Sequence, residues 1–169
     1  MMRRAALLGL LICAGCAARN TAVSDAFPVG SVASPWVLQG EIWSGTFDEA
    51  APALGDDAET WRKLTPTRVW LAIYGHELQP ERCVKVRCFA FATPENARTA
   101  YNVAAPLVAS RFQAGDEGCW TEIGVLYRWG RLVFDIFGDQ ATWASQVQAS
   151  YLSAVISRQM PPGAPENPQ

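Results

Sequence analysis

The chain has 169 residues, of which 50% are hydrophobic and 18% are charged. That balance is typical of one compact domain and excludes a largely disordered chain. The formal net charge of -2 argues against nucleic acid as a partner, because phosphate binding needs an excess of Lys and Arg.

Residues 1–15 have the three parts of a secretory signal peptide. Two arginines follow the initial methionines, residues 5–12 are apolar, and small residues directly precede Cys16. The apolar run is shorter than the roughly 20 residues that a membrane-spanning helix needs. These residues resemble the lipobox of bacterial lipoproteins, with Cys13 at a position where that family usually has Leu. The resemblance implies that Cys16 is diacylated and becomes the new N-terminus.

We therefore expect an exported protein that is anchored in membrane lipid at the cell envelope and faces the periplasm. Each methylene of an acyl chain that is buried in the bilayer contributes about 0.8 kcal/mol to membrane binding, so several acyl chains would anchor the protein firmly. The alternative is ordinary cleavage after Ala17 or Ala18, which gives a soluble periplasmic protein. Residues 16–35 are predicted to form a flexible tether, and the Pro-rich residues 159–169 a disordered tail. A single globular domain then occupies residues 36–158.

The first half of this domain predicts a strand, two helices and a strand, at residues 36–43, 57–64, 65–75 and 82–91. A loop is expected over residues 51–57. The second helix begins at a Thr-Pro pair and ends at a glycine, both usual boundary residues. The last strand alternates, which predicts that Val84, Val86 and Cys88 face inward.

The second half begins with a helix whose start, Thr93-Pro94, combines a capping residue with proline at the first position. Pro106 should kink or break that helix. Two alternating segments around the Gly130 turn predict a hairpin. A last helix follows, with an apolar stripe at Trp143, Val147, Tyr151 and Val155. This order favours an α+β fold, an antiparallel sheet with helices packed on one face and the other face open to solvent or a partner.

The residues at several of these helix and strand boundaries resemble those of an uncharacterised family of exported proteins, best known from planctomycetes and related bacteria. Its members have a helix that ends in an aromatic-Gly pair, here Tyr74-Gly75, and a helix start of the form [ST]-P-E-[ND]-A, here residues 93–97. A Gly-Asp pair at Gly115-Asp116 and a Gly-Arg hairpin at residues 127–131 are also similar. The resemblance covers about half of the mature chain. It implies an exported domain of this fold and assigns no activity or catalytic residue.

Few residues could carry catalysis. His76 is the only histidine, and no G-x-S-x-G, P-loop or G-x-G-x-x-G motif is present. At the end of the predicted helix, its imidazole could bond the last carbonyl groups. One histidine and scattered cysteines give no recognised zinc spacing. We therefore predict no catalytic residue, no metal and no cofactor.

Three cysteines remain in the predicted domain: Cys83, Cys88 and Cys119. The first two would lie about 16 Å apart in one extended strand, too far for a disulfide. We predict that a disulfide joins Cys88 to Cys119, since both share the parity of core residues and the envelope is oxidising. The alternative is that all three are small buried hydrophobes.

Tryptophan is abundant, with seven residues. Trp70 and Trp143 lie on predicted helical stripes and are assigned to the core. Trp43, Trp120 and Trp129 are less well explained by packing, and exposed aromatic side chains favour binding. These three form the candidate binding surface, although packing under the tether explains them nearly as well.

The leading hypothesis is a non-catalytic envelope domain that binds an envelope protein or glycan through the outer sheet face. One alternative is a carrier of a small apolar ligand, held between the sheet and the helix broken at Pro106. Another is a hydrolase that uses Cys83 or an acidic pair such as Asp56-Asp57.

Overall fold

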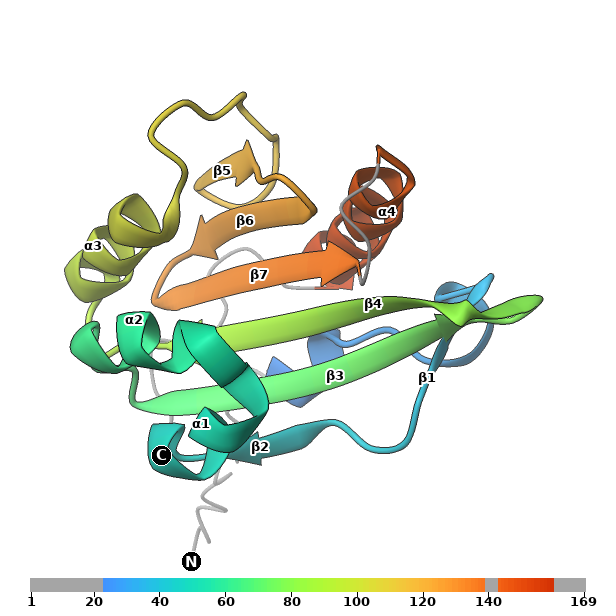
Figure 1. Cartoon of the computed structure of the whole chain (residues 1–169), viewed down its shortest axis with the longest axis horizontal. Coiled ribbons are helices and arrows are strands. Elements are labelled where there is room, and N and C mark those ends of the chain that lie inside the picture. The colour runs from blue at the N-terminus through green and yellow to red at the C-terminus, as the bar shows by residue number, and fades with distance from the viewer. Residues whose placement is uncertain (1–22, 139–142, 160–169) are drawn as a thin grey trace, which may run out of the picture.

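The domain is built on one antiparallel sheet (Figure 1). The computed structural model describes residues 23–138 and 143–159, so the predicted signal peptide, Cys16 and residues 160–169 lie outside the described residues. The strands are β1 (Trp36–Leu38), β2 (Trp43–Gly45), β3 (Arg68–His76), β4 (Gln79–Ala90), β5 (Glu117–Trp120), β6 (Gly124–Trp129) and β7 (Leu132–Gly138). They lie in the order β1-β3-β4-β7-β6-β5, and β2 also pairs with β3.

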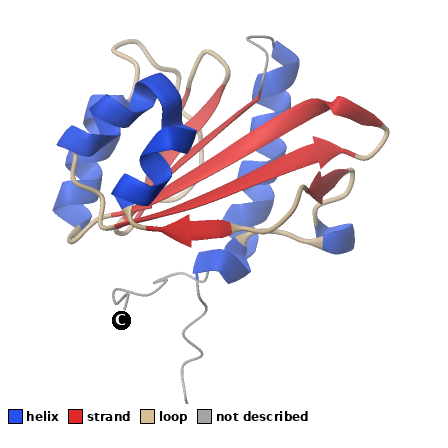
Figure 2. Ribbon diagram, turned by 60° about the horizontal axis from the view of Figure 1, so that its bottom comes forward, coloured by secondary structure: helices blue, strands red, loops and turns tan. Residues whose placement is uncertain are grey.

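Helices cover both faces of this sheet. They are α1 (Phe47–Leu54), α2 (Ala58–Lys63), α3 (Pro94–Ala104) and α4 (Trp143–Gln159), with single 3-10 turns at Val23–Ala26, Gly30–Val32 and Gly55–Asp57. The helices α1, α2 and α3 pack on one face, here called the front, whereas α4 crosses the back (Figures 1 and 2). The α+β class and the antiparallel sheet are confirmed. The face that was expected to be open is the one that α4 covers.

The central strands are therefore buried on both sides. In β4, Val84, Val86 and Cys88 point to the back cluster, as the alternation predicts, while Phe89 belongs to the front cluster. In β7, Phe134 lies in the back cluster and its neighbour Val133 in the front one. Strands buried on both faces carry apolar residues at successive positions, not only at alternate ones.

The helix predicted over residues 65–75 is wrong, because this segment forms β3. Val69 to Tyr74 is one continuous apolar run, and such a run cannot be assigned to helix or strand from its periodicity. Its valine, isoleucine and aromatic residues favour a strand. In the sheet, Trp70 lies opposite Cys88 of β4, and Tyr74 lies opposite Val84.

Helix α1 lies where the sequence analysis expected in part a loop. A capping box begins it: the Glu49 backbone N–H donates to Thr46 Oγ1 at 3.4 Å, and the Thr46 N–H donates to Glu49 Oε2 at 2.7 Å. Phe47, Ala50 and Leu54 then bury one side of the helix. The Thr-x-x-Glu spacing of this capping box is visible in the sequence and is itself a signal for a helix start.

Residues 23–35 are not a free tether. Ala26, Phe27 and Ala33 are buried in the back cluster, and the Tyr151 hydroxyl of α4 donates to the Ser34 carbonyl oxygen at 2.6 Å. The tether prediction is wrong for residues 23–35, and residues 16–22 lie outside the described residues.

The C-terminal helices also differ from expectation in detail. Helix α3 ends at Ala104, before Pro106, and Leu107 and Val108 are exposed in the following loop. In α4 the buried apolar side chains are Ala149, Leu152, Val155 and Ile156. Of the predicted stripe, Val155 is therefore buried, whereas Tyr151 is exposed. The side chains of Trp143 and Val147 lie outside the described set.

Arg128 ties the start of β5 to the β6–β7 turn. Its side chain is only 5% exposed and bonds the Glu117 carboxylate, Asp116 Oδ2 at 2.8 Å and the Gly130 carbonyl oxygen at 2.9 Å. Asp116 Oδ2 also accepts from the Gly130 N–H at 2.8 Å. A buried guanidinium with three acceptors closes this corner of the sheet.

We predict that Arg128→Ala lowers the free energy of unfolding by about 2 kcal/mol, the scale of hydrogen bonds to charged groups. Urea denaturation measures the change. Arg98→Ala is the control, because the Arg98 side chain pairs with the same Glu117 but is 64% exposed, with its Nε 3.6 Å from Glu117 Oε1. This substitution should change the free energy of unfolding by less than about 0.5 kcal/mol. Equal effects of the two substitutions would contradict this role for Arg128.

Candidate functional site

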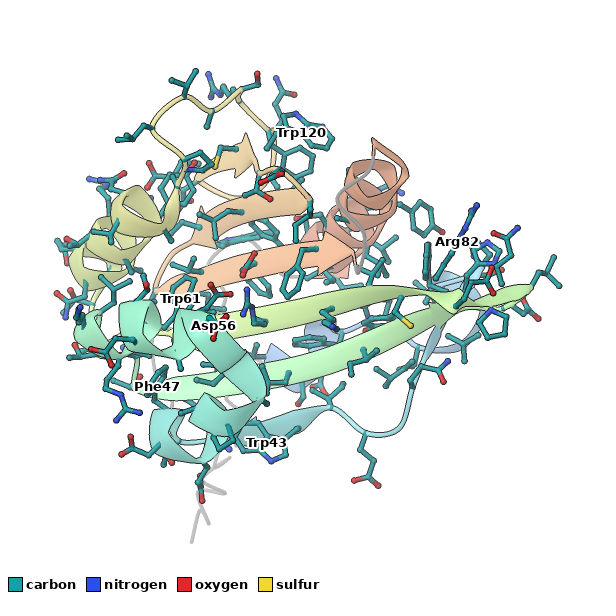
Figure 3. The ribbon with its side chains drawn as sticks, in the orientation of Figure 1. Trp43, Phe47, Asp56, Trp61, Arg82 and Trp120 are labelled. Carbon is teal, nitrogen blue, oxygen red and sulfur yellow. The ribbon has the colours of Figure 1, made fainter. Side chains whose placement is uncertain are left out.

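The three tryptophans of the predicted binding surface do not lie together. Trp43 of β2 is 38% exposed and pairs with Leu71 of β3, at one edge of the sheet. Trp120 and Trp129 lie at the other edge and pack against the back cluster. Figure 3 shows Trp43 and Trp120 at opposite sides of the molecule. The predicted binding surface therefore consists of two separate locations, one at each edge of the sheet.

Trp129 lines a cavity of about 610 Å³ at the back edge of the sheet. That volume falls in the range of about 300–1,000 Å³ that is usual for ligand pockets. The other residues that line it are Arg111, Phe112, Gln113, Ala114, Gly115, Asp116, Glu117 and Ser157. The wall thus combines the segment before β5, the end of β6 and one residue of α4.

Backbone hydrogen bonds hold the segment before β5 against the sheet. The Phe112 N–H donates to the Gly118 carbonyl oxygen at 2.9 Å, and the Trp120 N–H donates to that of Ser110 at 2.9 Å. Gly115 has a φ of 59° in the turn that follows, and a Cβ there would lie 2.2 Å from the Arg128 carbonyl oxygen. No other residue fits this turn without displacing the backbone.

The aromatic side chains around the cavity support one another. The rings of Phe112 and Trp120 meet edge to face, with centroids 5.0 Å apart. Trp120 therefore positions Phe112 from outside the cavity, while Phe112 and Trp129 line it. The sequence analysis identified both tryptophans and missed Phe112, which no local pattern distinguishes from a core residue.

Polar groups surround these rings. Arg111, Asp116 and Glu117 bring charges of both signs to the lining, and Arg128 fixes the two carboxylates from behind. Deeper in the fold, complete burial raises the pKa of Tyr127, an effect that the nearby Ser157 and Ser153 hydroxyls only partly offset. None of these three hydroxyl oxygens is in full hydrogen-bonding geometry with a partner.

His76 and Cys83, two residues considered for catalysis, lie elsewhere, whereas the acidic pair Asp116-Glu117 lines this cavity. His76 is at the end of β3, where its Nδ1 accepts from the Leu78 N–H at 3.2 Å and its ring meets Trp36 edge to face. It therefore bonds within the β3–β4 turn and does not cap a helix. Cys83 pairs in register with Gly75, whereas His76 pairs with Gln79.

The predicted disulfide between Cys88 and Cys119 is wrong. Cys88 lies in the back cluster on β4, whereas Cys119 lies in the front cluster on β5, and β7 and β6 separate the two strands. Three strand spacings amount to about 14 Å, twice the reach of a disulfide. Parity misled the prediction because both faces of the sheet are buried. Within the described residues, none of Cys83, Cys88 and Cys119 forms a disulfide.

Within residues 23–138 and 143–159, no three His, Cys, Asp or Glu side chains gather where they could hold a metal ion. In the same part of the chain, no helix is both long enough and apolar enough to span a membrane.

Comparison with protein-family models, with curated proteins and with solved structures finds no match to this chain. Inferences about function therefore rest on the sequence and on the geometry of the sites.

We predict that Cys88 reacts with iodoacetamide only when the whole domain unfolds. Its thiol is completely buried, and burial raises the pKa of Cys88 well above its usual value, so the reactive thiolate is scarce. The protein is labelled at increasing urea concentrations and the products are identified by mass spectrometry. Cys88 should become alkylated at the urea concentration of the unfolding midpoint, and half-buried Cys83 at a lower concentration. A disulfide-linked peptide that contains Cys88, in protein purified without reductant, would contradict the assignment of Cys88 as a buried thiol.

Proposed function

We propose that this chain is a non-catalytic binding domain of the bacterial cell envelope, anchored through Cys16, that holds a saccharide unit of an envelope glycan in the cavity beside Trp129. The cavity is the observation that carries the proposal. Its 610 Å³ volume and its two aromatic side chains provide room and apolar contact for a sugar ring.

The charged lining supports a sugar more than an apolar ligand. Arg111 can donate to sugar oxygens, and Asp116 and Glu117 can accept from sugar hydroxyls. Because Arg128 holds both carboxylates in place, little side-chain entropy is lost when a ligand binds. A protein partner, in contrast, would need about 800 Å² of matching surface on each side, which a cavity does not provide.

The envelope location rests on the leader alone. Its support is the signal-like residues 1–15 and the lipobox-like Cys16, and both lie outside the described residues. Since α4 covers the back of the sheet, a ligand reaches the domain at the edge of the sheet and not across an open face. The hypothesis of binding through the outer sheet face is revised accordingly.

Binding of the full chain to purified cell-wall glycan strands tests the proposal. We expect Trp129→Ala and Phe112→Ala each to weaken binding by more than about tenfold, because truncation of an aromatic anchor costs about 2 kcal/mol or more. Trp43→Ala is the matched control: it removes an exposed tryptophan at the opposite edge and should leave binding unchanged.

Circular dichroism and a urea midpoint on each variant separate loss of binding from loss of fold. If the folded Trp129 and Phe112 variants retain glycan binding, the cavity is not the binding site. If binding is lost in Trp43→Ala instead, the site lies at the β2 edge. A parent chain that binds no glycan but retains an envelope protein through Trp129 would overturn the choice of ligand.

A further inference from the structure

A second cavity lies on the front of the sheet, beside the C-terminal end of α3. Its volume is about 210 Å³, smaller than a typical pocket for a drug-sized ligand. The lining residues are Asp57, Thr60, Trp61, Arg87, Val103, Ala104, Thr121, Leu126 and Asp135. Figure 3 shows Trp61 on α2 above the sheet that forms the floor. One alternative from the sequence analysis places a small apolar ligand between the sheet and this helix, but the floor of the cavity is charged.

Arg87 of β4 is the centre of that floor, and all three of its guanidinium nitrogens are engaged. Nε and Nη2 donate to Asp135 Oδ2 at 2.9 and 2.6 Å, and Nη1 lies 2.8 Å from Asp57 Oδ2. The guanidinium carbon also lies 4.3 Å from the centre of the Phe137 ring. An anionic ligand would therefore have to displace a carboxylate that is already in place.

The carboxylates outnumber the cation. Asp57 and Asp135 face one arginine among the lining residues, so the cavity carries one more negative than positive charge. Both bonds to Asp135 and the one to Asp57 reach only the Oδ2 atoms, so Arg87 occupies neither Oδ1 atom. Each carboxylate has acceptor capacity beyond what Arg87 uses.

Burial makes the excess charge costly. The side chains of Arg87 and Asp135 are only 12% and 13% exposed. Loss of solvent raises the pKa of Asp135, and the neighbouring Arg87 offsets that effect only in part. A second cation next to Asp135 would supply compensation that Arg87 alone does not.

We propose that this cavity binds a small alkylammonium ion whose N–H groups donate to Asp135 and Asp57 and whose carbon chain lies against Trp61. Trp61 is fixed for this role, because it stacks on Phe89 with ring centroids 3.8 Å apart. The apolar side chains of Val103 and Leu126 complete the wall for a short alkyl chain. The site lies on the opposite side of the sheet from the Trp129 cavity and does not depend on glycan binding there.

Titration of the full chain with n-butylammonium chloride, followed by nitrogen–proton NMR, tests the proposal. The indole N–H signal of Trp61, identified by its loss in Trp61→Phe, should shift and saturate. The signals of Trp43 and Trp129 should not move. We expect n-butanol and sodium butyrate, at the same ionic strength, to leave the Trp61 signal in place.

Asp135→Asn should weaken butylammonium binding by at least about tenfold, since a hydrogen bond to a buried charge is lost. Asp57 is 57% exposed, so Asp57→Asn should fold normally and weaken binding less, by about threefold or more. Asp48→Asn is the matched control, because it removes an exposed carboxylate that pairs with Arg62 on the neighbouring helices. It should not change the affinity.

Three results would overturn the proposal. One is a Trp61 signal that does not respond to butylammonium, and another is an equal response to butanol, which would indicate an apolar site. The third is unchanged affinity in Asp57→Asn, which stays informative even if Asp135→Asn does not fold. Loss of glycan binding in the Trp129 variant has no bearing on these outcomes, so the two proposals fail independently.

Discussion

The burial of both faces of the central strands is the constraint on which this fold depends. β4 lies between β3 and β7, and its successive side chains enter two different clusters: Val86 and Cys88 at the back, Phe89 at the front. Each buried large apolar side chain contributes about 1.5–3 kcal/mol, so neither face can be left in water without a large loss of stability. The chain must therefore supply a layer of helix on both sides. Helices α1 to α3 form the front layer, and α4 with the turns of residues 23–33 forms the back one.

Both candidate sites lie where these layers end. At the back, the segment before β5 encloses Trp129 and Phe112 against Ser157 of α4. At the front, the C-terminal end of α3 leaves room over Arg87 and Asp135, whose charges occupy positions that an apolar pair would otherwise take. Charged side chains at such positions are tolerated only when they are paired, as these two are. In both places, charged side chains lie at the boundary of an apolar layer.

Local signals in the sequence predicted the elements with distinct ends. The Thr93 cap of α3, the Gly130 turn of the hairpin and the alternation that became β4 are all present in the structure. Two of the failures share one cause. β3 reads as a helix, and Cys88 appears to share a face with Cys119, only if the sheet has a single buried face. The sequence identifies Trp129 only as an aromatic residue that core packing does not readily explain. The front cavity could not be found, because Arg87 and Asp135 are 48 positions apart and no local pattern joins them.

Native-state hydrogen exchange across α4 tests the two-layer arrangement most directly. If α4 seals the back of the sheet, the buried stretch around Leu152 and Ile156 should exchange with the same opening free energy as the central residues of β4 and β7. That value should equal the global free energy of unfolding from urea denaturation. Rapid exchange throughout α4 while β4 stays protected would contradict the account, because the back of the sheet would then be open in solution.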